Sequence, residues 1–120
     1  MPESHLILVV EDDDELRHTL VELLEEEGYR TLEAANGRSA LDLLARQSEL
    51  PALILLDLMM PVMNGWEFRH AMLGKSFESV PTVVLTASRE LEKRPIQAPY
   101  VLQKPIHVAE LLDLLSKHFG

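Results

Sequence analysis

The sequence contains no cysteine. This absence excludes disulfides, thiolate catalysis and cysteine-based zinc sites, and it suits a reducing compartment. No apolar run approaches the roughly 18 residues of a membrane-spanning helix, and the first residues lack the pattern of a signal peptide. We therefore expect a cytoplasmic protein that does not enter a membrane.

Basic residues are scarce, with 11 lysines and arginines against 20 aspartates and glutamates and a net charge of −9. Nucleic acids and anionic membranes are bound through basic patches, so this balance argues against both as direct partners. Two acidic clusters stand out, Glu11–Glu15 and Glu25–Glu27. We expect the second to be a solvated helix end, and Asp13 and Asp14 to complement the dipole of a helix N-terminus.

Short apolar runs alternate with segments of helical periodicity. The apolar runs predict strands at Leu6–Val10, Arg30–Ala34, Leu53–Leu56, Thr82–Leu85 and Tyr100–Leu102. Helical spacing of apolar residues appears at Leu16–Leu24, Ala40–Leu44, Trp66–Leu73 and Val108–Phe119. Such alternation predicts an α/β fold, in which right-handed crossovers build a parallel sheet with helices on both faces. With no linker or repeat, residues 1–120 are expected to form one domain.

Polar residues follow four of the apolar runs. They are Glu11 with Asp12, then Asp57, Thr86 and Lys104. The carboxyl ends of parallel strands meet at one edge of the sheet, where α/β proteins bind ligands. Three carboxylates there would repel one another unless a cation lay among them, and an incomplete cage of oxygen ligands suits Mg²⁺. An aspartate at such a site can attack phosphorus and form an aspartyl phosphate.

Four segments, LVVEDDDELR, LILLDLMMPVMNGWEF, VVLTAS and VLQKPI, resemble the receiver domains of two-component response regulators. They cover nearly the whole chain in the order of the family. The resemblance implies a doubly wound, flavodoxin-like fold with five parallel strands in the order 2-1-3-4-5. It also implies a stand-alone signalling module of a phosphorelay, which is not an enzyme apart from catalysing its own phosphorylation and dephosphorylation.

The resemblance assigns the ligands of the metal site. Asp57 matches the phosphoacceptor, and Glu11 and Asp12 match the acidic pair that holds Mg²⁺, with Asp12 the more direct ligand. Met59 matches the position whose backbone carbonyl completes the metal site. We expect Mn²⁺ to substitute for Mg²⁺.

Two further residues match the groups that contact the phosphoryl oxygens. Thr86 matches the switch hydroxyl, and Lys104 matches the lysine that pairs with the acceptor and the phosphate. The bond between Lys104 and Pro105 is expected to be cis, as it usually is in the family. The donor implied by the resemblance is a phosphohistidine on a sensor histidine kinase or a histidine phosphotransfer domain. The sequence does not identify the downstream protein.

One departure from the family lies between Thr86 and Lys104. This interval is short by about one helical turn. It also contains Pro95 and Pro99, which resist helix continuation. We predict that the fourth helix is truncated, displaced or replaced by an irregular loop.

A second departure concerns the switch aromatic, which in the family lies three residues before the lysine. Val101 occupies that position, and Tyr100 points to the opposite face of the strand by alternation. We therefore predict intact phosphorylation chemistry with an unconventional read-out. The affected face is the one on which receivers form homodimers or dock partners.

Three other functions compete with this interpretation. A Mg²⁺-dependent phosphohydrolase would carry an Asp-x-Asp nucleophile motif, but Asp57 is followed by Leu58 and Met59. An adaptor that keeps the fold and ignores phosphate is favoured by Val101 and disfavoured by the complete acidic set. A flavin carrier would need a glycine- and hydroxyl-rich loop after the first strand, and acids occupy that place.

Overall fold

A single five-stranded parallel sheet forms the centre of the computed structural model, which describes residues 4–87, 95–96 and 98–120. The strands are β1 (Leu6–Val10), β2 (Arg30–Ala34), β3 (Leu53–Asp57), β4 (Thr82–Thr86) and β5 (Tyr100–Gln103). The helices in the described ranges are α1 (Asp14–Glu26), α2 (Gly37–Arg46), α3 (Gly65–Met72) and α5 (Val108–Phe119). The strand order is β2-β1-β3-β4-β5, which confirms the predicted doubly wound fold.

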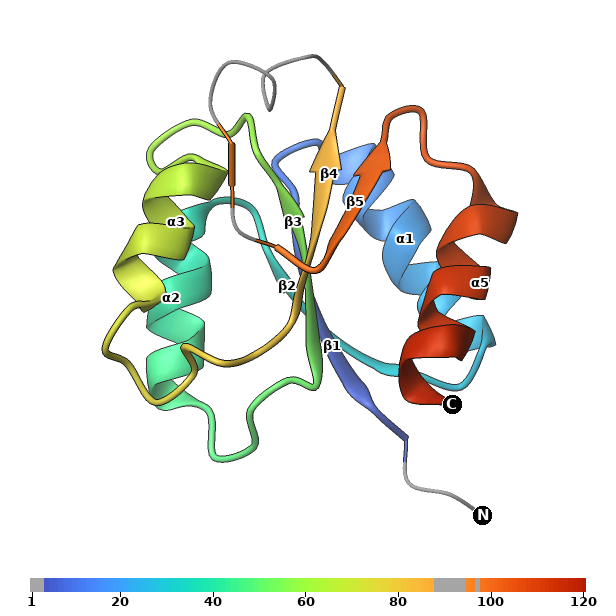
Figure 1. Ribbon diagram of the computed structural model, residues 1–120, viewed down its shortest axis with the longest axis horizontal. Coiled ribbons are helices and arrows are strands. Elements are labelled where there is room, and N and C mark those ends of the chain that lie inside the picture. The colour runs from blue at the N-terminus through green and yellow to red at the C-terminus, as the bar shows by residue number, and fades with distance from the viewer. Residues whose placement is uncertain (1–3, 88–94, 97) are drawn as a thin grey trace.

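The helices cover both faces of this sheet. In Figure 1, α2 and α3 lie on one side and α1 and α5 on the other. Residues of β1 alternate between the two cores: Ile7 and Val9 pack with residues of α1 and α5, and Leu8 and Val10 with residues of α2 and α3. Every residue of β1, β3 and β4 is buried, which explains why these strands are apolar apart from Asp57, Thr82 and Thr86 at strand ends.

The register of the strands brings their polar ends together. Strands β1 and β3 are paired up to Val10 and Leu56, so Glu11 and Asp57 follow on neighbouring strands. On the other side of β3, Thr86 lies one residue beyond the partner of Asp57. The three polar ends therefore reach the same edge of the sheet.

Strand β5 alternates as predicted. Tyr100 and Leu102 pack into the core beside α1 and α5, whereas Val101 and Gln103 are exposed. The peptide bond between Lys104 and Pro105 is cis, as the resemblance implied. The predicted irregularity of the fourth helix falls on residues 88–94 and 97, which lie outside the described ranges. Within the ranges given above, no helix has both the length and the apolar character needed to cross a bilayer.

The start of α3 lies unusually close to the end of β3. Asn64 and Glu67 form a reciprocal capping box at this helix start. The backbone N–H of Gly65 donates to the Leu58 carbonyl at 2.9 Å. A Cβ atom on Gly65 would lie 2.6 Å from Leu58 Cδ2 and 3.1 Å from the Asp57 carbonyl oxygen. Only glycine allows this approach, so Gly65 determines how α3 supports the backbone of Asp57.

The loop between β3 and α3 contains a strained residue. Val62 has a φ of 68° and the residue is 79% exposed. A β-branched residue is disfavoured in this left-handed region, and so exposed a side chain gains little packing to offset the cost.

Replacement of this valine is expected to stabilise the protein. Val62→Asn should raise the free energy of unfolding by about 1 kcal/mol, because asparagine tolerates the left-handed conformation. Urea denaturation measures the change. Val108→Asn is the matched control, since Val108 is exposed at the start of α5 and has no positive φ. Equal effects of the two substitutions would contradict the strain argument.

Candidate functional site

Three carboxylates meet at the carboxyl edge of the sheet. One oxygen from each of Glu11, Asp12 and Asp57 lies within 4.8 Å of the other two. Glu11 is fully buried and Asp57 is 3% exposed, whereas Asp12 is exposed. Among the described residues this is the one group of three that could hold a metal ion.

The lysine at the end of β5 reaches the same carboxylates. Lys104 Nζ lies 2.8 Å from Glu11 Oε1 and 3.3 Å from Asp57 Oδ1. The backbone N–H of Lys104 donates to the Thr86 carbonyl at 2.7 Å, which ties the end of β5 to the end of β4. The structure thus brings together four residues that the sequence predicted for the site, with Thr86 buried beside them.

Met59 also adjoins the acceptor. Its backbone N–H donates to Asp57 Oδ1 at 3.4 Å, and the residue is 56% exposed. The role of its carbonyl as a metal ligand stays a prediction.

Burial and neighbouring charges shift the pKa values of Asp57 and Lys104. The pKa of Asp57 is raised to about 7, chiefly by burial and then by the charge of Glu11, and Lys104 offsets this in part. Burial lowers the pKa of Lys104, but Glu11 and Asp57 outweigh it, so the pKa of the ammonium is raised overall. One ammonium therefore does not neutralise the site completely.

The residues present fit a divalent cation. Glu11 is fully buried, and the Lys104 ammonium 2.8 Å from Glu11 Oε1 is shared with Asp57. Buried carboxylates are unfavourable unless their charge is compensated, and one ammonium against three carboxylates leaves negative charge that a cation would offset. Three carboxylate ligands from one side of a site suit Mg²⁺, which leaves positions for water and for phosphoryl oxygens. The arrangement can thus hold a metal beside an aspartate nucleophile.

Sequence reasoning assigned no role to two residues that support this site, Gly65 and Arg17. Gly65 holds α3 against the end of β3. Arg17 lies in α1 and donates to the Glu11 carbonyl. A signal was present for Arg17, because a cation in the first turns of a helix is unfavourable to the helix dipole. Such a residue implies a specific partner.

Comparison with known proteins gave consistent matches. The family model of the response regulator receiver domain matches residues 7–116. Sporulation initiation phosphotransferase F of Bacillus subtilis (strain 168) is 35% identical over 116 residues, covering 93% of this chain and 91% of that protein.

Two solved structures extend the comparison. Chemotaxis response regulator CheY4 of Vibrio cholerae superposes with a TM-score of 0.85 at 30% identity, over 96% of this chain and 98% of that one. The receiver domain of sensor histidine kinase PA1611 from Pseudomonas aeruginosa PAO1 has a magnesium ion coordinated in its active site cleft. It superposes with a TM-score of 0.84 at 28% identity, over 96% of this chain and 97% of that one.

The raised pKa of Asp57 makes a prediction about stability. The usual pKa of an aspartate is 3.8, and that of Asp57 in the folded protein is about 7. The folded state is therefore favoured by protonation of Asp57: this contribution is fully present below pH 3.8 and is lost as the pH rises through about 7. Asp57→Asn cannot ionise, so in metal-free protein it should raise the free energy of unfolding by roughly 2 kcal/mol at about pH 8 and have little effect near pH 4.

Denaturant titrations at the two pH values measure this difference. Asp113→Asn is the control, because Asp113 pairs with Lys117 at the surface and its side chain is 63% exposed. A stabilisation by Asp57→Asn that did not change with pH would contradict the proposed ionisation penalty.

Proposed function

Because the chain belongs to the response regulator receiver domain family, we propose that Asp57 is the phosphoacceptor of a two-component phosphorelay. Receiver domains are signalling modules rather than ordinary enzymes. The observation that carries the proposal is the cluster of Glu11, Asp12 and Asp57 with the Lys104 ammonium against two of its members. We take residues 1–120 as one such domain.

The chemistry assigns a task to each side chain. A carboxylate oxygen of Asp57 forms a bond to phosphorus while the bond between phosphorus and the donor histidine nitrogen breaks. The nitrogen keeps the electron pair and takes up a proton from solvent. Asp57 must be ionised for this attack, and its raised pKa means that a nearby positive charge is needed to favour the carboxylate.

The residues around Asp57 would hold the metal ion and offset the negative charge of the phosphoryl group. Glu11 and Asp12 would hold Mg²⁺ together with Asp57 and the Met59 carbonyl. When bound, Mg²⁺ would neutralise charge on the acids and on the phosphoryl oxygens. Lys104 would pair with a phosphoryl oxygen through the ammonium that now contacts Glu11 and Asp57. The magnesium ion in the similar PA1611 receiver domain supports the metal part of this proposal.

Partners follow from the same chemistry. The donor would be a phosphohistidine on a sensor kinase or phosphotransfer domain, and the reaction would take place in the cytoplasm. Attack of water on phosphorus would later release inorganic phosphate and restore the Asp57 carboxylate. The domain would thus act on itself, and the lifetime of the phosphoryl group would determine how long a downstream protein is bound.

Phosphorylation of Asp57 can be tested directly. Incubation with acetyl phosphate and Mg²⁺ should add one phosphoryl group to the wild type, observed by intact mass, and none to Asp57→Asn. The adduct should be removed by hydroxylamine, as expected for an acyl phosphate, and chelation of Mg²⁺ should prevent it. Asp113→Asn, which alters an exposed acid, should be labelled as the wild type is. Equal labelling of Asp57→Asn would refute the assignment.

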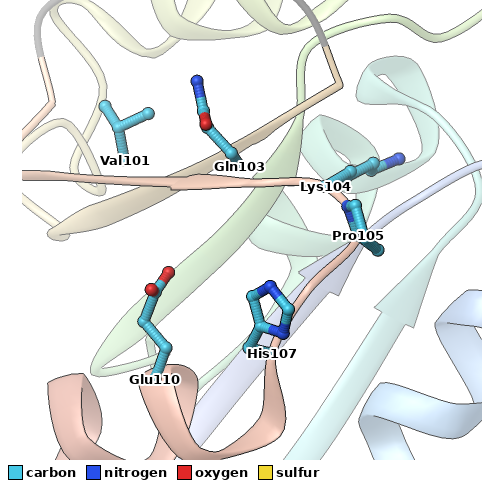
Figure 2. A pocket seen from close by; sticks show the side chains of 6 residues that line it. All are labelled: Val101, Gln103, Lys104, Pro105, His107 and Glu110. Carbon is cyan, nitrogen blue, oxygen red and sulfur yellow. The ribbon is translucent and has the colours of Figure 1, made fainter.

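The face formed by β5 and α5 lacks the usual aromatic switch. Val101 is 45% exposed, and it projects with Gln103 to the same side of β5 (Figure 2). Tyr100 lies on the other side, packs into the core and shares a hydrogen bond with His118 Nδ1 at 2.9 Å. This partner on α5 holds the Tyr100 ring, so Tyr100 is not placed to move as a substitute switch.

The same face is hollowed beside the site. A cavity of about 400 Å³ is lined by residues of β5 and of the start of α5 (Figure 2), namely Val101, Gln103, Lys104, Pro105, His107 and Glu110. Lys104 is shared between the cavity wall and the acidic cluster. We infer that phosphorylation is transmitted to this face through the backbone of Lys104 and its bond to Thr86 rather than through an aromatic ring.

Beryllofluoride, a phosphoryl mimic, tests this read-out. With Mg²⁺ it should shift the amide NMR signals of Thr86, Gln103 and Lys104 and leave the ring signals of Tyr100 unchanged. The Tyr29 ring, which packs in the same core, is an internal reference. A large change in the Tyr100 ring would contradict the inferred route, and binding without any shift in β5 would favour an adaptor that ignores phosphate.

A further inference from the structure

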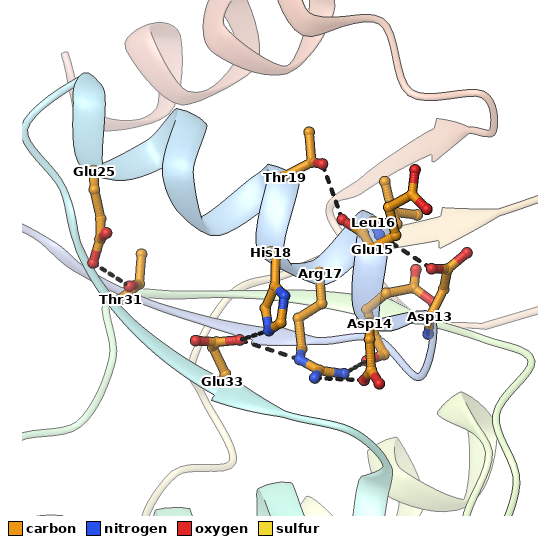
Figure 3. Close-up of polar contacts among 11 residues, drawn as sticks. Asp13, Asp14, Glu15, Leu16, Arg17, His18, Thr19, Glu25, Thr31 and Glu33 are labelled. Atoms are coloured by element: carbon orange, nitrogen blue, oxygen red, sulfur yellow. Dashed lines mark hydrogen bonds and ion pairs between the residues drawn. The ribbon is translucent and has the colours of Figure 1, made fainter.

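Arg17 joins three segments of the chain at one side of the acidic cluster. Its Nη1 donates to the Glu11 carbonyl at 2.8 Å, its Nη2 to Asp14 Oδ1 at 2.6 Å and its Nε to Glu33 Oε1 at 3.2 Å. The acceptors belong to the loop after β1, to the first turn of α1 and to β2. Figure 3 shows the guanidinium between Asp14 and Glu33. The Arg17 side chain is only 12% exposed.

The contact with Glu11 differs from an ordinary surface ion pair. The carbonyl that Arg17 binds belongs to the peptide unit between Glu11 and Asp12. A peptide unit is planar and includes both flanking Cα atoms, so a hydrogen bond to its oxygen orients the directions in which both acids leave the backbone. The hydrogen bond to the Glu11 carbonyl thus restrains the orientation of both Glu11 and Asp12, which are proposed as metal ligands.

Neighbouring hydrogen bonds hold the rest of this loop. The Glu11 N–H donates to the Ala34 carbonyl at 3.1 Å, and the Asp13 N–H donates to Glu11 Oε2 at 3.2 Å. Asp13 in turn caps α1 by accepting from the Leu16 N–H at 3.1 Å. Arg17 adds a charged group to this set, and three of its nitrogens donate to three different residues. These bonds anchor the loop to β2 as well as to α1.

We propose that Arg17 is a positioning residue for the metal site, raising its affinity for Mg²⁺ by fixing the peptide between Glu11 and Asp12. This inference rests on the proposed function of the acidic cluster. The direction in which the Mg²⁺ affinity changes when Arg17 is replaced is informative, because the positive charge of Arg17 by itself would repel Mg²⁺ and lower the affinity. If charge were the only effect, removing the guanidinium would tighten binding. If positioning dominates, removal weakens binding.

Calorimetric titration of metal-free protein with Mg²⁺ separates the two effects. Arg17→Gln should bind Mg²⁺ about tenfold more weakly than the wild type, as is usual when a group behind a metal ligand is removed. Arg17→Lys keeps the charge and loses the fork of donors, so it should also bind more weakly, by about threefold. Any loss of affinity in Arg17→Lys cannot come from a change in net charge.

Arg30→Gln is the matched control. Arg30 also makes two hydrogen bonds to a carboxylate, at 2.8 and 2.7 Å to Glu49, and its loss changes the net charge equally. Arg30 begins β2 and contacts the Ser4 carbonyl before β1 and Glu49 after α2. It therefore lies at the amino ends of the strands, opposite to the acids. Its Mg²⁺ affinity should equal that of the wild type.

A metal-free measurement gives a second readout. Amide exchange at Asp13 should be faster in Arg17→Gln, because the loop is less restrained. Should Arg17→Gln not fold, as judged by thermal unfolding, Arg17→Lys decides the matter. Wild-type affinity in Arg17→Lys, or tighter binding in Arg17→Gln, would overturn the role of Arg17. Absence of Mg²⁺ binding by the wild type would overturn the proposed function instead.

Discussion

Two buried carboxylates, Glu11 and Asp57, lie side by side at the ends of neighbouring strands. The register pairs Val10 with Leu56, so the next residue on each strand is one of these acids. Because the strands are packed on both faces, moving either acid would disturb a core layer. The repulsion between the acids therefore persists in the folded state, and it adds to burial, the larger cause, in raising the pKa of Asp57. A cation must offset it. Lys104 does so in part, and the remaining demand is what makes the site suitable for Mg²⁺.

The surrounding loops are organised to keep that arrangement. Gly65 lets α3 approach the Asp57 backbone, Thr86 holds the backbone of Lys104, and Arg17 holds the peptide after Glu11. Each of these contacts is made through a main-chain atom, so each directs a charged side chain without approaching it. The charges stay available for a metal and a phosphoryl group while their directions are restrained.

Signal read-out is separable from this chemistry. The Tyr100 ring lies on the core side of β5 and is held by His118, whereas Val101 occupies the exposed switch position. An alternating strand cannot move a side chain from one face to the other without a change of register. The route that we infer for a conformational signal from Asp57 to this face is therefore the backbone path from Thr86 to Lys104.

The amino-acid sequence by itself determined the fold class and the main residues of the site. Continuous apolar runs and helical spacing identify buried strands and covering helices, and a parallel sheet must gather its strand ends at one edge. Other features depended on tertiary contacts between residues distant in sequence. The positive φ of Val62, the close approach of Gly65 to Leu58 and the three partners of Arg17 have no periodic signal. Periodicity reports which face a residue occupies, whereas hydrogen bonds and close approaches depend on how separate elements meet in space.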